Sequence, residues 1–209
     1  MAKQLGFHLD ASACTACKAC MIACKDRSDL PVGINYRKVY EYGGGEWVTD
    51  SAHKDLLIPS NLFAYSVSVA CMHCEKPICT EVCPVSAITK GKDGIVLIDQ
   101  EKCIGCRYCE WACPYGAPQF NEDKGYMTKC DFCQDLQAKG QNPVCVDACP
   151  MRALEVGELG ELHAKYGNLS AIEPLPNADL TLPSLVITPH KNAQASGQGT
   201  GRILSLEES

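Results

Sequence analysis

The sequence predicts a mixed α+β fold made of two nested modules, with an inserted hairpin and an extended C-terminal arm. Three observations predict it: sixteen cysteines in 209 residues, an internal repeat among them, and a Pro-, Gly- and Ser-rich stretch at the end. The net charge of −6 and the apolar content exclude disordered and collagen-like chains and argue against a general nucleic-acid binder. A protein of this length buries a core without disulfides, so the cysteines have another role.

The cysteines fall into four groups of four with none left over. The first and third groups share the spacing C-x2-C-x2-C-x3-C, the second is C-x2-C-x4-C-x3-C, and the fourth is C-x2-C-x11-C-x3-C. Four complete groups predict four metal centres. The groups are Cys14, Cys17, Cys20 and Cys24; Cys71, Cys74, Cys79 and Cys83; Cys103, Cys106, Cys109 and Cys113; and Cys130, Cys133, Cys145 and Cys149.

The spacing of the first and third groups is that of bacterial ferredoxins. There, three closely spaced thiolates bind one 4Fe-4S cluster and the fourth binds the other cluster of a pair. Pro84, Pro114 and Pro150 follow the last cysteine of groups two, three and four, as this pattern requires, whereas Lys25 follows group one. With four thiolates for each centre, no iron is left open to bind a substrate.

An internal repeat pairs the groups. Asp10 precedes Cys14 by four residues, and Asp99 precedes Cys103 by four, each after an apolar strand-like run. Groups two and four share the ending C-x3-C-P-x2-A. We therefore expect groups two and three to form an inner ferredoxin-like module over residues 71–125. Groups one and four should form an outer module from residues 1–25 with 126–157.

The inner module should contain a glycine-containing turn at residues 91–94, followed by a strand at residues 95–98. Residues 26–70 are an insertion expected to supply partner-binding strands. Within it we predict an aromatic-rich hairpin over Asn35–Val48 that turns at Gly43–Gly45, and a strand over Leu62–Val69.

Residues 158–209 are expected to form a helix and an extended C-terminal arm. The helix is predicted over Glu158–Tyr166. The prolines and the Gly/Ser-rich end of residues 170–209 favour an extended segment over a packed domain. The apolar run Leu182–Thr188 is expected to bury against a partner chain.

Other uses of the cysteines fit less well. Zinc sites pair two separated C-x2-C units, so a triplet with two-residue gaps suits zinc poorly, but a zinc-bound structural protein stays open as an alternative. Attachment of c-type haem would need a histidine after C-x2-C, and none follows. No nucleophile with a base, paired acids or P-loop is recognisable. We therefore expect electron transfer without bond chemistry, and no catalytic residues.

The chain resembles the iron-sulfur electron-transfer subunit of dimethyl sulfoxide reductase, within the four-cluster ferredoxin-like subunits of molybdopterin oxidoreductases. The stretches that carry the resemblance are CTACKACMIACKD, YRKVYEYGGGEW, CIGCRYCEWACPYGAPQFNEDKGYMTKCDFC and CVDACPMRALEVG. It implies four 4Fe-4S clusters, whose ligands would form four sets. The first set is Cys14, Cys17, Cys20 and Cys149; the second is Cys24, Cys130, Cys133 and Cys145; the third is Cys71, Cys74, Cys79 and Cys113; the fourth is Cys83, Cys103, Cys106 and Cys109.

The resemblance also implies partners. They are an integral membrane anchor that oxidises menaquinol and a molybdopterin-containing catalytic subunit that reduces dimethyl sulfoxide or related S- or N-oxides. The same relay in a polysulfide, thiosulfate or selenate reductase is the alternative. The chain shows no secretory signal, twin-arginine pair or membrane span. We therefore expect it to be peripheral, held at the periplasmic face after export with a twin-arginine partner; the cytoplasmic face stays open.

Four bound clusters would change the charge of the chain. Each oxidised cluster with its four thiolates adds about −2, which takes the total from −6 to about −14. Such charge calls for nearby cations and backbone N–H donors. Six cations in or beside the motifs are candidates to tune the clusters: Lys18, Lys25, Lys76, Lys102, Arg107 and Lys129.

Overall fold

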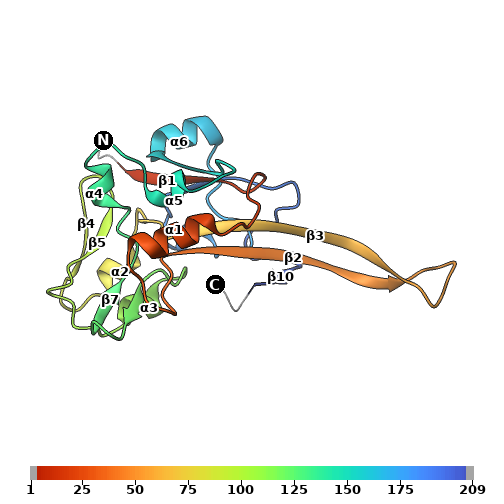
Figure 1. The fold of residues 1–209 in the computed structure, drawn as a ribbon, viewed down its shortest axis with the longest axis horizontal. Coiled ribbons are helices and arrows are strands. Elements are labelled where there is room, and N and C mark those ends of the chain that lie inside the picture. The colour runs from red at the N-terminus through yellow and green to blue at the C-terminus, as the bar shows by residue number, and fades with distance from the viewer. Residues whose placement is uncertain (1–3, 206–209) are drawn as a thin grey trace.

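The structure is a computed structural model that describes residues 4–205, so the ends of the expected outer module and arm, residues 1–3 and 206–209, lie outside the described residues. It is a mixed α/β protein in which short elements gather at one end and a long hairpin projects from the other (Figure 1). The elements are β1 (Leu5–Asp10), α1 (Ala19–Arg27), β2 (Arg37–Thr49), β3 (Leu57–Ala70), α2 (Ile78–Glu81), β4 (Ile88–Lys90), β5 (Val96–Ile98), α3 (Tyr108–Ala112), β6 (Gln119–Asn121), β7 (Tyr126–Thr128), α4 (Gln134–Gln137), α5 (Val144–Asp147), β8 (Leu154–Glu158), α6 (Leu159–Tyr166), a 3-10 turn (Ala178–Leu180), β9 (Leu185–Thr188) and β10 (Arg202–Ile203).

Strand β1 is the centre of a three-stranded sheet. It pairs with β8 antiparallel and with β9 parallel. Its apolar sequence fits this place, because a central strand is covered on both faces. Leu9 and Val186 are fully buried, and the His8 ring stacks on Tyr166 of α6 with ring centroids 3.5 Å apart.

Strands β2 and β3 form one long antiparallel hairpin, paired from Arg37 with Ala70 to Thr49 with Leu57. Its base carries Val39 and Val67, which are buried in the same core as β1. Beyond the base no residue from 45 to 62 is buried. We call residues 45–62 the arm; it extends away from the helices in Figure 1.

The predicted turn at Gly43–Gly45 is wrong. These glycines lie inside β2, where the register with β3 shifts between Gly44 and Glu46, and the chain reverses at residues 50–56 instead. The expected separate strand at residues 62–69 is part of β3, the partner of β2. Two constraints explain why glycines occupy these positions. A Cβ at Gly44 would lie 2.8 Å from the Phe63 ring, and Gly45 has a φ of +117°, which other residues rarely adopt.

Two small hairpins lie beside α2 and α3. Strands β4 and β5 pair across the glycine turn that the sequence predicts, in which Gly91 N–H donates to Ile95 O at 2.8 Å. Strands β6 and β7 pair from Gln119 with Thr128 to Asn121 with Tyr126. This second hairpin crosses the expected module boundary between residues 125 and 126.

The C-terminal segment differs from the expected arm held by a partner. Residues 159–166 are helical, close to the prediction, but β9 lies in the protein's own central sheet, with Leu185 and Ile187 buried. Ser184 Oγ also donates to His73 O at 2.9 Å. The segment packs here because β1 offers an unpaired edge that a four-residue apolar strand fills. Among residues 4–205, no helix combines the length and apolar character needed to cross a membrane.

Candidate metal centres

The cysteines of the first set lie around one cavity. Cys14, Cys17 and Cys20 come from the loop after β1 and the first turn of α1, and Cys149 comes from the end of the α5 segment. Positive φ angles at Ala16 (55°) and Lys18 (60°) allow the loop to wrap around the cavity. Burial raises the pKa of Cys14 and of Cys20.

The second set is a buried group between α1 and α5. Cys24, Cys130, Cys133 and Cys145 are all buried, and they are close enough to affect one another electrostatically. Burial and then the charge of Cys145 raise the pKa of Cys24 to about 12. Phe132 N–H donates to Cys130 Sγ at 3.4 Å.

The third set also surrounds a cavity. Cys71, Cys74, Cys79 and Cys113 line it together with Lys129 and Thr181. Burial, the largest cause, raises the pKa of Cys74 and of Cys79 to about 12, and neighbouring thiolates add to the rise. The C-terminal segment therefore contributes to this wall through Thr181.

The fourth set lines a cavity near β5 and α3. Its members are Cys83, Cys103, Cys106 and Cys109, with Ile104 and Met127 beside them. Burial and then the charges of Cys103 and Cys106 raise the pKa of Cys109 to about 11. The cysteines of the first, third and fourth sets thus line three cavities, and those of the second set are all buried; their division into four ligand sets stays a prediction.

A matching pair of backbone contacts explains the repeated ending C-P-x2-A. Ala87 N–H donates to Cys83 Sγ at 3.3 Å, and Ala153 N–H donates to Cys149 Sγ at 3.3 Å. Because the two endings fold alike, the same amide reaches the same sulfur in the fourth and first sets. Such N–H···S hydrogen bonds stabilise a thiolate that binds iron.

The donor chemistry fits iron-sulfur clusters. Four thiols for each site are a soft ligand set, and thiols with raised pKa values become thiolates only when a metal replaces the proton. The four thiols of the first, third and fourth sets each line one common cavity, as the ligands of a single cluster must. When bound, a 4Fe-4S cluster supplies reversible one-electron chemistry.

The expected cations lie in different environments. Lys129 is buried and lines the third cavity, and Lys18 lines the first and pairs with Glu41 at 3.6 Å. Lys25 donates to the carbonyls of Pro31 and Ile34. Of the others, Lys102 is paired with Asp99 and Arg107 with Glu110, and the backbone N–H of Lys76 donates to Thr181 O.

Sequence reasoning missed one cation, Arg37. Its side chain is 2% exposed and lies among cysteines of the first and second sets. The signal was the alternation in β2, because Arg37 shares a strand face with the buried Val39.

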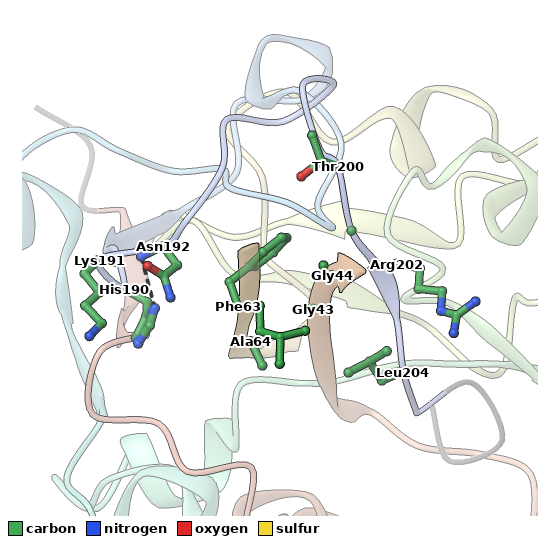
Figure 2. Close-up of a pocket in the computed structure, with 13 residues that line it drawn as sticks. Gly43, Gly44, Phe63, Ala64, His190, Lys191, Asn192, Thr200, Arg202 and Leu204 are labelled. Atoms are coloured by element: carbon green, nitrogen blue, oxygen red, sulfur yellow. Dashed lines mark hydrogen bonds between the residues drawn. The ribbon is translucent and has the colours of Figure 1, made fainter. Parts of the chain in front are cut away.

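A larger groove without cysteines lies at the base of the hairpin. It encloses about 860 Å³ between β2, β3, β10 and the segment that follows β9. Figure 2 shows Gly43 and Gly44 beside Phe63 in its centre, with His190 and Lys191 on one side and Arg202 on the other. The groove continues to the exposed Leu62, where the arm begins.

Comparisons with known proteins agree with this chemistry. Residues 62–159 match the model of a 4Fe-4S dicluster domain, and residues 11–36 match that of a 4Fe-4S binding domain. The sequence is 50% identical to the B subunit of anaerobic dimethyl sulfoxide reductase from Escherichia coli K12, over the full length of both proteins. It is 49% identical to the Haemophilus influenzae protein of the same name, over 95% of this protein and 96% of the other. The B subunit of polysulfide reductase from Wolinella succinogenes is 33% identical over 91% and 97%.

The fold and the sites define a 4Fe-4S protein that transfers electrons and is not a catalytic subunit. Both matching models describe 4Fe-4S binding, so the zinc alternative is set aside. This protein belongs to the family of the iron-sulfur subunits known as the B subunits of anaerobic dimethyl sulfoxide reductase.

Proposed function

We propose that this protein relays electrons through four 4Fe-4S clusters. They would pass from a quinol-oxidising membrane anchor to a molybdopterin catalytic subunit that reduces dimethyl sulfoxide or related S- or N-oxides. Each of the four cysteine sets would hold one cluster. The observation that carries the proposal is that the four members of each set lie together although they come from distant parts of the sequence.

The arrangement of the sets supports a single linear path. Cys20 of the first set and Cys24 of the second lie one helical turn apart on α1. Cys130 of the second set and Cys71 of the third belong to the same small group of buried, packed residues. The third and fourth sets are joined twice, because Cys113 follows Cys109 by four residues and Cys83 follows Cys79 by four.

Features at both ends of this path support contacts with partner subunits. At the first set Cys17 is exposed, and Val39 and Ser68 at the base of the hairpin line the cavity. We assign the arm and the adjacent groove to docking of a partner at this end. At the fourth set Ile104 is 63% exposed, and Tyr108 and Trp111, whose ring centroids lie 5.7 Å apart, are 51% and 73% exposed. Large exposed apolar side chains next to one another are typical of protein interfaces.

We further propose that the subunit is peripheral, attached to the membrane only through its partners, at the periplasmic face. Export together with a partner that carries a twin-arginine leader would bring the folded, cluster-containing subunit to that face. Expression with and without the catalytic subunit, followed by cell fractionation, tests this: attachment should require the partner subunits. Membrane attachment of the isolated protein would contradict it.

Metal analysis tests the number of clusters. The anaerobically purified protein should contain about sixteen irons and sixteen sulfides, since each of four clusters contains four of both. Cys106→Ser should alter one electron paramagnetic resonance signal, that of the fourth set, and leave the others unchanged. About eight irons, or a change in several signals, would contradict the proposed sets.

The similarity to the polysulfide reductase B subunit supports a second candidate, the same relay for another acceptor. The assembled complex, reduced with a quinol analogue, should be reoxidised by dimethyl sulfoxide if the first candidate holds. Reoxidation by polysulfide or thiosulfate alone would favour the second.

A further inference from the structure

Arg37 is a buried cation with free hydrogen-bond donors. Its Nη1 donates to Ser68 Oγ at 3.1 Å, but Nε and Nη2 have no hydrogen-bond partner. None of the ion pairs found among residues 4–205 involves Arg37. A guanidinium that is buried without a counter-ion is strongly destabilising, so its position requires negative charge nearby.

That negative charge belongs to two cysteine sets at once. Burial alone would lower the pKa of Arg37, but the thiolates of Cys145, Cys20, Cys130 and Cys24 outweigh burial and raise it. Cys20 belongs to the first set, and the other three belong to the second. Arg37 is therefore close enough to cysteines of both sets to interact with them electrostatically.

Its contacts hold the guanidinium in this place. The Ser68 hydroxyl that accepts from Arg37 also lies 3.3 Å from Cys20 Sγ, so a series of polar contacts leads to the first set. On the other side, Arg37 Cζ lies 4.8 Å from the centroid of the Phe7 ring, which packs on Phe132 beside the second set. Because these contacts fix the guanidinium, its free N–H groups cannot turn toward other acceptors.

We propose that Arg37 is the shared counter-cation of the first and second clusters, and that its free N–H groups donate to sulfur atoms at both sites. This inference rests on the proposed cysteine sets. A cluster with four thiolates carries about −2 when oxidised and about −3 when reduced. A fixed cation stabilises the more negative form more, so Arg37 raises the reduction potential of both clusters.

The other cations near the sets do not have this combination of features. Lys129 is buried, but its Nζ donates to the carbonyls of Cys130 and Val96. Lys102 and Arg107, near the fourth set, are exposed and paired with Asp99 and Glu110. Arg37 alone among these combines burial with unpartnered donors.

The test is a redox titration of the full-length protein, prepared anaerobically with its clusters and followed by electron paramagnetic resonance. In Arg37→Gln, two of the four midpoint potentials should fall. For each of these two clusters we expect the equilibrium constant for reduction to drop about tenfold, which corresponds to about 59 mV for a one-electron step. The other two should stay in place. Arg37→Lys keeps the charge but loses the fork of donors, so we expect the same two potentials to fall by less. Lys102→Gln is the matched control and should shift neither of them.

Three results would overturn the inference: unchanged potentials with full iron content, a shift in one potential only, or an equal shift in all four. If Arg37→Gln loses iron, Arg37→Lys decides, and unchanged potentials in that variant overturn the inference. Iron analysis of the unmodified protein separates the two proposals. Fewer than about sixteen irons counts against the proposed function, whereas full iron with unshifted potentials counts against the role of Arg37 alone.

Discussion

At the scale of single residues, backbone amides and one buried cation define the surroundings of the thiols. The amides of Ala87 and Ala153 reach equivalent sulfur atoms, so a short sequence repeat becomes a repeated hydrogen bond. Arg37 has no counterpart in the repeat, because it comes from the inserted hairpin. The inserted hairpin thus places a buried positive charge near cysteines of the first and second sets.

His8 gives a prediction about pH. It is 4% exposed, its Nε2 lies 2.9 Å from Thr188 Oγ1, and burial lowers its pKa below 6.5, although Glu155 and Asp10 act in the opposite direction. A histidine with a lowered folded pKa contributes stability above its unfolded pKa and loses it as the pH falls through the folded value. Between about pH 7.5 and pH 5, His8→Gln should therefore lose less thermal stability than the unmodified protein.

The measurement is the difference in Tm between the two proteins at each pH. Acid damage to the clusters affects both and cancels in the difference. A difference that stays constant over this range would show that the pKa of His8 is the same in the folded and the unfolded protein, and it would contradict the prediction.

The spacing of the cysteines could be read from the sequence, but the buried position of Arg37 could not. Ligand spacing is a local property, so Cys14, Cys17 and Cys20 can be assigned to one loop without a structure. The environment of Arg37 depends on how β2 packs beside α1 and α5, which no local pattern specifies. An arginine in a polar stretch is normally exposed, and only its alternation with Val39 suggests burial.

At the scale of elements, β9 makes the C-terminal segment part of the fold. A variant that ends after Gly167 lacks β9 and the Thr181 wall of the third cavity, so we expect it to lose most of its iron. A variant that ends after Asn192 keeps both and is the control; it should retain its iron. Iron content and sedimentation of the two truncations check this. Full iron in the shorter variant would contradict it.

For the arm we expect the opposite result: its removal should affect binding of the partner subunit and not the iron content. Because none of residues 45–62 is buried, replacing them with an Asn-Gly turn should leave the iron content and the Tm unchanged. Co-purification with the partner subunit should be lost, since an exposed two-stranded ribbon with Trp47 and Leu57 on it has no other contacts to stabilise it. Lys54→Ala, in the exposed loop, is the control. Unchanged co-purification would remove the arm from the interface.

Two elements show where prediction from sequence ends. Three consecutive glycines normally indicate a turn, and their use as a bulge depends on the Phe63 ring from another strand. Likewise, the prolines around Leu185–Thr188 suggest a linker, and four apolar residues become a strand only because β1 provides an edge. In both cases the deciding contact is distant in sequence.

At the scale of the whole molecule, the cysteine sets connect distant parts of the sequence. The first set joins residues 14–20 to Cys149; Cys20 and Cys149 are buried, and burial raises the pKa values of Cys14 and Cys20. Removing iron with a chelator should therefore loosen the three-stranded sheet of β8, β1 and β9, since metal binding contributes to folding. Limited proteolysis should show new cleavage near β1, reversed when iron and sulfide are restored. Identical cleavage with and without iron would contradict this.

The position of Cys149 in the first set also bears on biosynthesis. A nascent polypeptide presents every member of the third and fourth sets once residue 113 has left the ribosome, but the first cavity stays incomplete until Cys149 emerges. Iron should therefore reach the third and fourth sets before the first set, although Cys14, Cys17 and Cys20 of the first set are translated earliest. Stalled polypeptides long enough to release residue 113 while Cys149 is still inside the ribosome should take up radioactive iron at the third and fourth sets only, and uptake at residues 14–20 would exclude this order.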